Sequence, residues 1–272
     1  PEVYPGSRRI VLKNVVKLAL LTPATLLNRC KSNAHFPFRD WDYELTREGA
    51  FVGLEKLPKD TPLVSVITRT RGLRNVQLRQ ALLSVAHQSY PNVEQIVVED
   101  GSCESEETVK EIAQLTGRAI RFIKQPKLGR SAAGNAGLAA ARGKWCLFLD
   151  DDDLLFADHL ETLALALRQD SSACAAYSLA WEVLTEYQFG DGKHIEKCHS
   201  VSGLQRQDFD YSVLKHHNYM PIQSVLFERR LFVERGGMDE GLNSLEDWNM
   251  WLRFAFRNRF VYVHKVTYLY NT

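Results

Sequence analysis

Residues 145–156 read WCLFLDDDDLLF, so that four consecutive aspartates, Asp150–Asp153, follow directly on a mostly apolar run. Such a run before a block of charge is typical of a buried strand that ends at the rim of a sheet. Two carboxylates about 5 Å apart repel by about 3 kcal/mol at an effective dielectric constant near 20, so the block needs a compensating charge. A divalent cation would supply it, and oxygen ligands without His or Cys favour Mg2+ or Mn2+ over zinc. The alternative interpretation is a solvated acidic loop in which Asp153 or Asp158 caps the next helix.

Segments with strand and helix periods alternate on both sides of this run. Short apolar runs predict strands at residues 63–68, 93–100, 119–124 and 145–149. Helical patterns follow each of them, which favours a mainly parallel α/β sheet whose ligands bind beyond the carboxyl ends of the strands. Unusual polar residues follow all four predicted strands: Arg69 and Arg71, then Glu99 and Asp100, then Lys124, then Asp150–Asp153.

The amino-terminal part has a different character. Residues 1–40 contain seven Lys and Arg and two acids, a net +5, so the other 232 residues carry −4 of the total +1. Residues 8–28 mix basic and apolar residues in a helical pattern, which predicts either a helix on a membrane surface or a helix packed against protein. We expect residues 1–61 to form a basic helical extension and linker, and residues 62–272 to form one α/β domain of a longer protein with other domains.

Composition argues against several classes of protein. The five cysteines form no CxxC pair and no zinc pattern, so we expect reduced thiols in a cytoplasmic compartment. The sequence has no run of about 18 apolar residues, so no membrane-spanning helix is predicted. Basic residues of the main part are dispersed and its net charge is negative, which gives no support to nucleic-acid binding.

Three segments carry a family resemblance. VSVITRTRG begins at residue 64, GRSAAGNAGLAAARGKWCLFLDDDDLL at 129 and SVLFERRLFVERGGMDEGLNSLEDWNMWLRFA at 224. In this order they resemble the family 2 inverting glycosyltransferases, and the resemblance covers about residues 62–270. It implies the GT-A fold, an α/β architecture with a Rossmann-like, mainly parallel central sheet flanked by helices.

The resemblance also implies roles for single residues on the donor side. FLDDDD is similar to the DxD motif, which places Asp150 near the donor ribose or the metal, Asp151 on the nucleotide-sugar, and Asp152 on a Mn2+ or Mg2+ ion. Asp100 of VEDGS resembles a carboxylate that accepts a hydrogen bond from a uracil ring. Arg130 of GRSAAGN would face the nucleotide or its diphosphate.

The end of the first predicted strand departs from the family pattern. It reads RTRG where the family usually has PTYN, so Arg69, Thr70 and Arg71 would line the donor site without the usual aromatic contact to the base. Uridine is the base that we favour, with deoxythymidine and guanosine as alternatives.

The acceptor side is expected near residue 247. LEDW resembles the acceptor-base motif, in which Asp247 would take the proton of the acceptor hydroxyl, with Glu246 beside it. Alternatively, Ser244 and Asp247 form a capping box at the start of a helix. His264 follows the last strand, where some relatives place a metal-ligating His.

Taken as a set, these residues predict a metal-dependent inverting glycosyltransferase. It would move a sugar from a nucleotide-diphosphate donor, a UDP-sugar above all, to a hydroxyl of a glycan or glycolipid during the synthesis of surface polysaccharide such as lipopolysaccharide. Displacing a diphosphate requires charge neutralisation and a general base. The alternatives are a non-catalytic nucleotide- or glycan-binding scaffold, and a DxD-type phosphohydrolase, which normally has Thr or Val where Leu154 stands. We expect a cytoplasmic protein, with peripheral contact at the inner face of the cytoplasmic membrane through residues 8–28.

Overall fold

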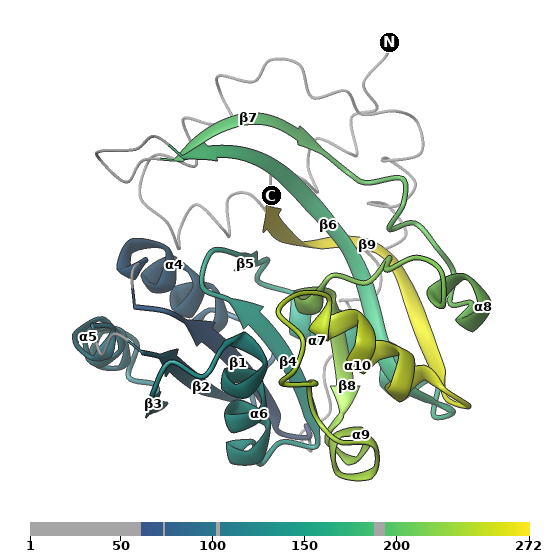
Figure 1. Cartoon of the computed structure of the whole chain (residues 1–272), viewed down its shortest axis with the longest axis horizontal. Helices are drawn as coiled ribbons and strands as arrows, with labels where there is room; N and C mark the ends of the chain where they lie inside the picture. Colours follow the sequence, from purple (N-terminus) through teal and green to yellow (C-terminus); the bar gives the residue numbers. More distant parts are fainter. Residues whose placement is uncertain (1–60, 73, 102–103, 188–193) are drawn as a thin grey trace.

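Nine strands join into one sheet in the computed structural model, which describes residues 61–72, 74–101, 104–187 and 194–272 (Figure 1). The predicted basic helix at 8–28, and all but the last residue of the predicted extension at 1–61, lie outside the described residues. Their structure and their contact with a membrane therefore stay predictions.

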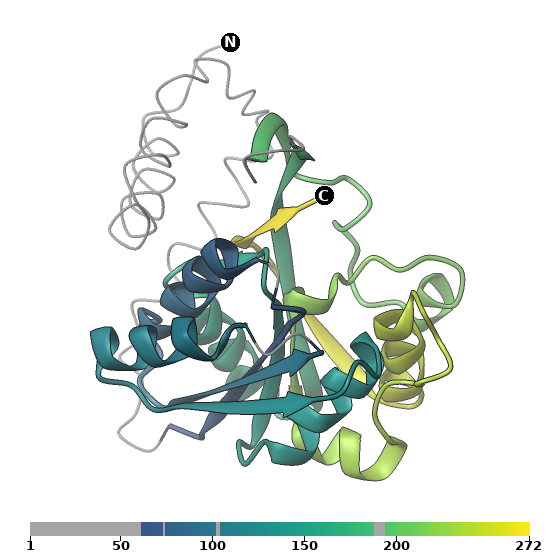
Figure 2. The same cartoon turned by 60° about the vertical axis from the view of Figure 1, so that its left-hand side comes forward.

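The first half of the sheet is parallel, as predicted. Its strands lie in the order β3-β2-β1-β4, and their bounds are β1 (Val64–Thr70), β2 (Val93–Asp100), β3 (Ile120–Gln125) and β4 (Trp145–Asp150). The register places Arg69 beside Val98 on one side and Asp150 on the other. The polar residues at the carboxyl ends of these strands therefore meet at one edge, and β3 is the outermost strand, which comes forward in Figure 2.

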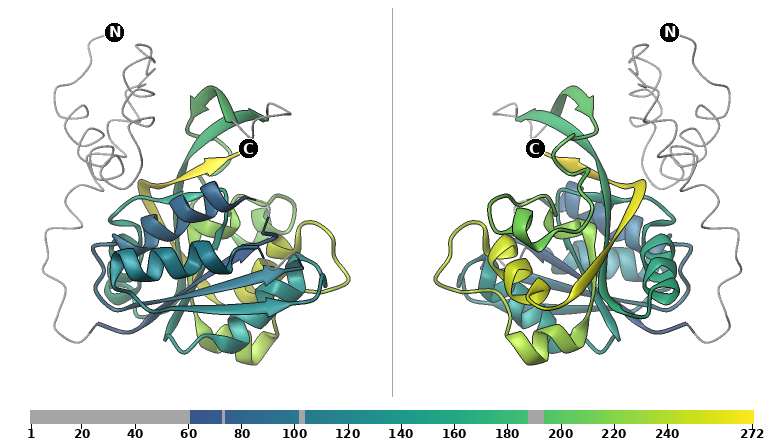
Figure 3. Two further views of the ribbon diagram at one scale, coloured as in Figure 1. Left: turned by 90° about the vertical axis from the view of Figure 1, so that its left-hand side faces the viewer. Right: turned by 90° about the vertical axis from the view of Figure 1, so that its right-hand side faces the viewer.

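The second half mixes strand directions. β8 (Val225–Glu228) runs antiparallel to both β4 and the long β6 (Ala173–Tyr187), and β9 (Arg259–Asn271) runs parallel to β6. The two-residue β5 (Leu154–Leu155) pairs with β9, and β7 (His194–Ser200) pairs with the far end of β6. This β6–β7 ribbon extends away from the layered part of the molecule, as Figure 3 shows.

Helices cover both faces of the sheet. One face carries α4 (Asn75–Ala86), α5 (Glu106–Thr116) and α7 (His159–Gln169), and the other carries α6 (Arg130–Ala140), α9 (Arg229–Arg235) and α10 (Glu246–Ala255). In β4, Leu147 and Leu149 pack toward α7 while Phe148 packs toward α6 and α10. A strand buried on both faces explains why WCLFL is almost continuously apolar. The short α8 (Tyr211–Leu214) and the 3-10 turn η1 (Ile222–Ser224) lead into β8.

Two expectations from composition concern membrane-spanning helices and cysteines. None of their helices is long and apolar enough to cross a lipid bilayer. Three of the five cysteines lie in this part, with Cys146 and Cys174 buried and Cys198 exposed, and all three are free thiols.

Candidate active site

A cleft of about 570 Å³ opens at the carboxyl ends of β1, β2 and β4. Its volume is in the range of ligand pockets. Its wall contains every residue that the sequence predicts for the nucleotide-sugar and both of the predicted metal-binding aspartates: Arg69, Thr70, Arg71, Asp100, Arg130, Asp150, Asp151 and Asp152. Arg74 and Lys127 add positive charge, and the polypeptide from Glu240 to Asn243 contributes to the opposite wall.

Arg69 joins the two sides of this site. Its side chain is only 6% exposed, and its Nε and Nη2 donate to the two carboxylate oxygens of Asp150 at 2.8 and 2.9 Å. Its Nη1 donates to Oε1 of Glu246 at 3.0 Å. Burial lowers the pKa of Arg69, but Asp150 and Glu246 outweigh that effect and the net pKa is raised. Arg69 is therefore a fixed positive charge between β4 and the start of α10.

The four aspartates face different partners. Asp151 is buried and accepts a hydrogen bond from the Thr70 hydroxyl at 2.7 Å, and burial raises its pKa to about 6, with Asp152 adding to the effect. Asp153 is buried on the far side, where it accepts from the backbone N–H of Asn271 at 2.9 Å. Asp150 and Asp152 thus remain as the more exposed carboxylates at the cleft.

The capping alternative for this run is wrong. Asp158 occupies the N-cap position of α7 but makes no side-chain capping bond; its Oδ2 instead accepts from Nζ of Lys265 at 2.8 Å. Because Asp153 faces β9 and Asp151 faces β1, the aspartate run is built into the sheet edge and is not a solvated loop.

Arg74, which the sequence analysis missed, neutralises Asp152. Its Nη1 pairs with Oδ2 of Asp152 and lies 3.6 Å from Oδ1 of Asp151. The Arg74 side chain is 40% exposed, so this contact lies at the mouth of the cleft. The sequence does contain a signal, since Arg69, Arg71 and Arg74 lie within six residues at the end of the first strand. It does not say which of these arginines reaches the aspartates.

Asp100 organises the loop before α6. Its Oδ1 accepts from the backbone N–H of Leu128 at 2.8 Å and from Nε2 of Gln125 at 2.9 Å, and its Oδ2 accepts from the N–H of Gly129 at 3.0 Å. Gly129 has φ 100°, a conformation that favours glycine. Asp100 therefore shapes the cleft wall in addition to its predicted contact with a base, which stays a prediction.

The start of α10 brings two acids to the same region. Glu246 is 3% exposed and pairs with Arg69 and also with Nε of Arg130 at 3.1 Å. Asp247 is half-buried; its Oδ1 accepts from the N–H of Trp248 at 2.7 Å and its Oδ2 from Asn218 at 3.3 Å. Burial raises the pKa of Asp247, with Glu246 adding to the effect.

The alternative of a capping box at Ser244 is wrong. Leu245 is the N-cap residue of α10, it has φ 59°, and no side chain caps the helix there. Asp247 lies inside the first turn and is directed to Asn218. The motif LEDW thus places Glu246 on Arg69 and Arg130, next to the cleft, while Asp247 bonds Asn218 and the N–H of Trp248; neither acid is part of the cleft wall itself.

The donor set suits a hard cation only in part. Among residues 61–72, 74–101, 104–187 and 194–272, no three His, Cys, Asp or Glu side chains are grouped to hold a metal. Asp150 and Asp152 supply oxygen ligands at the cleft, and Mg2+ sites commonly add water and substrate phosphates to one or two carboxylates. The residues therefore fit Mg2+ or Mn2+ bound together with a diphosphate.

His264 is not brought to the aspartates. Its Nε2 lies 3.3 Å from Oδ1 of Asp208, and its ring contacts Tyr262. Asn271 is the residue of β9 whose backbone N–H bonds Asp153. His264 stands seven residues before it on the same strand, which is roughly 23 Å along an extended chain.

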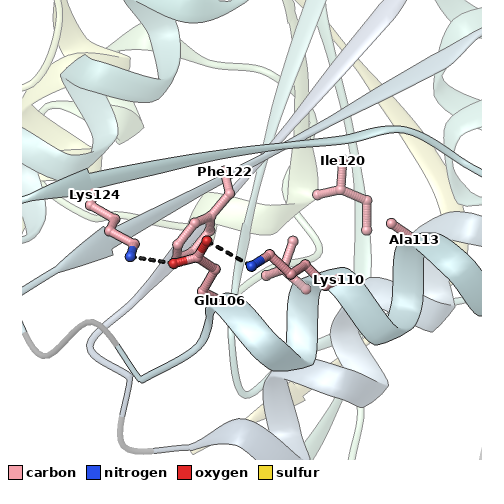
Figure 4. A pocket seen from close by; sticks show the side chains of 7 residues that line it. Glu106, Lys110, Ala113, Ile120, Phe122 and Lys124 are labelled. Carbon is pink, nitrogen blue, oxygen red and sulfur yellow. Dashed lines mark ion pairs between the residues drawn. The ribbon is translucent and has the colours of Figure 1, made fainter.

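Lys124 is also outside the cleft. A second hollow of about 370 Å³ lies between α5 and β3, and Figure 4 shows Lys124 and Lys110 directed at Glu106 in its lining. Both ammonium groups pair with the Glu106 carboxylate, Lys110 at 3.0 Å. The lysine at the end of β3 thus stabilises the start of α5 instead of lining the cleft.

Comparisons with known proteins agree with this geometry. The family model described as Glycosyl transferase family 2 matches residues 64–229. An uncharacterized glycosyltransferase from Rickettsia bellii is 29% identical over 213 residues, covering 78% of this chain and 30% of that protein. Glycosyltransferase GlyA from Streptococcus pneumoniae is 27% identical, covering 76% and 30%, and chondroitin synthase from Pasteurella multocida is 24% identical, covering 76% and 20%.

Solved structures show the same fold. TarS from S. aureus superposes with a TM-score of 0.61 at 18% identity, covering 77% of this chain and 60% of that chain, and related structures of it contain UDP or UDP-GlcNAc. A mannosyltransferase from Pyrobaculum calidifontis, in complex with GDP-Man and Mn2+, gives a TM-score of 0.58 at 18% identity, with 84% and 67% covered. These are GT-A glycosyltransferases, which confirms the predicted fold. The chain spans less than a third of the length of the first two relatives. By the match over most of its described residues, the chain belongs to glycosyl transferase family 2.

Proposed function

We propose that this chain is the catalytic domain of a metal-dependent inverting glycosyltransferase that uses a UDP-sugar. One observation carries the proposal: Arg69 binds Asp150 on the donor side and Glu246, the neighbour of Asp247, on the other. The carboxylates suited to a cation and the candidate base thus belong to one connected site. Two groups of this kind are what displacement of a diphosphate by an alcohol requires.

The donor would lie along the basic wall of the cleft. Arg71, Lys127 and Arg130 supply positive charge for the diphosphate, and Asp150 and Asp152 would hold the cation. When bound, Mn2+ or Mg2+ would neutralise the charge that develops on the leaving diphosphate. The complexes of TarS with UDP and of the Pyrobaculum enzyme with GDP-Man and Mn2+ support a nucleotide-sugar donor and Mn2+.

Asp247 is the better general base of the two acids on α10. Glu246 is held by two guanidinium groups, those of Arg69 and Arg130, so its carboxylate is already engaged in ion pairs. Asp247 accepts hydrogen bonds from two uncharged donors, the Asn218 amide and the Trp248 N–H, and burial raises its pKa. Asp247 would take the proton of the acceptor hydroxyl while the acceptor oxygen forms its bond to the anomeric carbon and the bond to the diphosphate breaks on the opposite face. This inverts the anomeric carbon without a covalent intermediate.

The acceptor that we propose is a hydroxyl of a glycan or glycolipid in surface polysaccharide synthesis. The relative named chondroitin synthase supports a glycan product. The cytoplasm, at the inner face of the membrane, is the compartment that we propose, because the donor is a nucleotide-sugar and residues 8–28 are basic and amphipathic.

Calorimetric titration with UDP, dTDP and GDP, with and without Mn2+, tests the donor side. We expect UDP to bind most tightly and only with Mn2+, and both Asp152→Ala and Asp100→Ala to weaken it. Asp208→Ala is the control, because Asp208 is 82% exposed and is not part of the cleft wall. Folded wild-type protein that binds none of the three nucleotides would overturn the proposal.

A further inference from the structure

We propose that Arg74 is a tethered counter-ion: it holds Asp152 while the donor is absent and leaves when the cation binds together with the diphosphate. The inference rests on the proposed function, because it concerns how the same site receives its cation. Its basis is a contrast between two of the arginines that pair with the aspartate run, Arg69 and Arg74.

Arg69 is fixed. It is 6% exposed and makes three hydrogen bonds to carboxylate oxygens, two on Asp150 and one on Glu246. If it moved away, it would leave two poorly solvated carboxylates with only the more exposed Arg130 as counter-charge, and breaking a buried ion pair is strongly unfavourable. Asp150 therefore keeps its arginine whether or not a ligand is present.

Arg74 can exchange. It precedes α4, its side chain is 40% exposed, and the Asp152 side chain that it contacts is 26% exposed. An ion pair this close to solvent contributes little stability, so its rupture costs little. Solvent is available to the guanidinium as soon as it leaves Asp152.

The position of Arg74 puts its guanidinium where a cation on Asp152 would bind. Its Nη1 lies between the carboxylates of Asp152 and Asp151, where the negative charge of the run is concentrated. Two positive charges this close together repel each other, and a divalent cation doubles the repulsion. A cation and the Arg74 guanidinium therefore compete for Asp152.

The diphosphate gives the displaced guanidinium a new partner. Arg74 lines the cleft, and an arginine can bind phosphate oxygens through two parallel hydrogen bonds. A cation without nucleotide must compete with Arg74 for Asp152. When a diphosphate binds with the cation, the displaced Arg74 guanidinium can form hydrogen bonds to the phosphate oxygens instead. Weak binding of the cation alone and tighter binding with nucleotide follow from this arrangement.

Titration of the whole chain with Mn2+ in the absence of nucleotide tests the idea, with free Mn2+ followed by electron paramagnetic resonance. Arg74→Gln should bind Mn2+ about tenfold more tightly than wild type, because a competing charge is removed. Arg74→Lys keeps the charge and should stay close to wild type. Arg79→Gln is the matched control, since Arg79 lies on α4, the helix that Arg74 precedes, and pairs with Glu111 at 2.8 Å, away from the cleft.

A double variant tests whether the effect acts through Asp152. In Arg74→Gln combined with Asp152→Asn, the gain over Asp152→Asn alone should vanish. The inference is overturned if Arg74→Gln binds Mn2+ no more tightly than wild type, if Arg79→Gln gives the same gain, or if the gain survives without Asp152. Thermal unfolding of each variant shows that it is folded.

A parallel titration with UDP separates this inference from the proposed function. Absence of UDP binding to the wild-type protein in the presence of Mn2+ would overturn the proposed function. UDP binding that depends on Mn2+, together with an unchanged Mn2+ affinity in Arg74→Gln, would overturn only the role of Arg74.

Discussion

Glu246 and Asp247 are neighbours with the same charge, yet their surroundings assign them different roles. We expect Asp247→Asn to lower kcat by about 100- to 10,000-fold while the affinity for UDP with Mn2+ changes little, because a general base contributes to the chemical step. Sugar transfer and calorimetry measure the two quantities on the same protein. Asp208→Asn is the matched control at an exposed aspartate. Activity of Asp247→Asn within threefold of wild type would exclude Asp247 as the base.

Arg69 should matter for folding as well as for the donor. Arg69→Met would leave Asp150 and Glu246 with only the more exposed Arg130 as counter-charge, and removing one partner of a buried pair costs about 3–5 kcal/mol. Urea denaturation measures the free energy of unfolding. Arg71→Met, at an exposed position of the same cleft, should change it by less than about 1 kcal/mol. Equal effects of the two substitutions would show that the Arg69 network does not stabilise the fold.

Helix α6 depends on one glycine for its place on the sheet. A Cβ at Gly137 would lie 2.3 Å from Cγ2 of Ile67 on β1, in a region with no exposed surface. Gly137→Ala should therefore destabilise the protein by about 1–3 kcal/mol, although alanine favours helix by about 1 kcal/mol. Thermal unfolding measures the change. Ala139→Gly, on the exposed side of α6, is the control and measures the preference of the helix for alanine over glycine alone. If Gly137→Ala stabilised the protein, α6 would be able to move away from β1.

The parallel strands were predictable and the mixed half of the sheet was only partly so. VEQIVVED and WCLFL are apolar runs bounded by turn residues, and the predicted limits match β2 and β4 to within one residue. The length of β6 and its pairing with both β8 and β9 were not predicted, because strand order depends on contacts between segments distant in sequence. The helix start at Leu245 was missed for another reason. Leu245 has a left-handed backbone conformation, and a leucine in the sequence gives no sign of that conformation.

The site shows the same division between local and distant information. The donor-side carboxylates could be predicted because each follows a strand, so the parallel register brings them to one edge. The pairing of Arg69 with Glu246, 177 residues apart, and of Arg74 with Asp152 could not, because a side chain's partner depends on packing in three dimensions. His264 illustrates the reverse error, since proximity to the last strand end in sequence did not bring it to the aspartates.

Acid stability of the whole domain should depend on His159. This residue is fully buried where α7 meets β9, its Nδ1 lies 2.6 Å from the Thr267 hydroxyl, and its ring contacts Tyr268. Burial lowers its pKa to about 3, with Asp158 opposing the effect. In the unfolded chain the pKa is about 6.5, so the unfolded state takes up a proton first as the pH falls.

The sign of the effect follows from these two pKa values. The stability that neutral His159 contributes is complete above pH 6.5 and is lost as the pH falls toward 3, by about 2 kcal/mol between pH 6.5 and 5. Urea denaturation at pH 7 and pH 5 measures the loss. His159→Gln should be less stable than wild type at pH 7 but should lose about 2 kcal/mol less on going to pH 5, whereas His87→Gln, at an exposed position, should lose as much as wild type. If His159→Gln and wild type lose the same free energy, protonation of His159 does not limit the acid stability of the domain, and the buried carboxylates near β9 become the groups to examine.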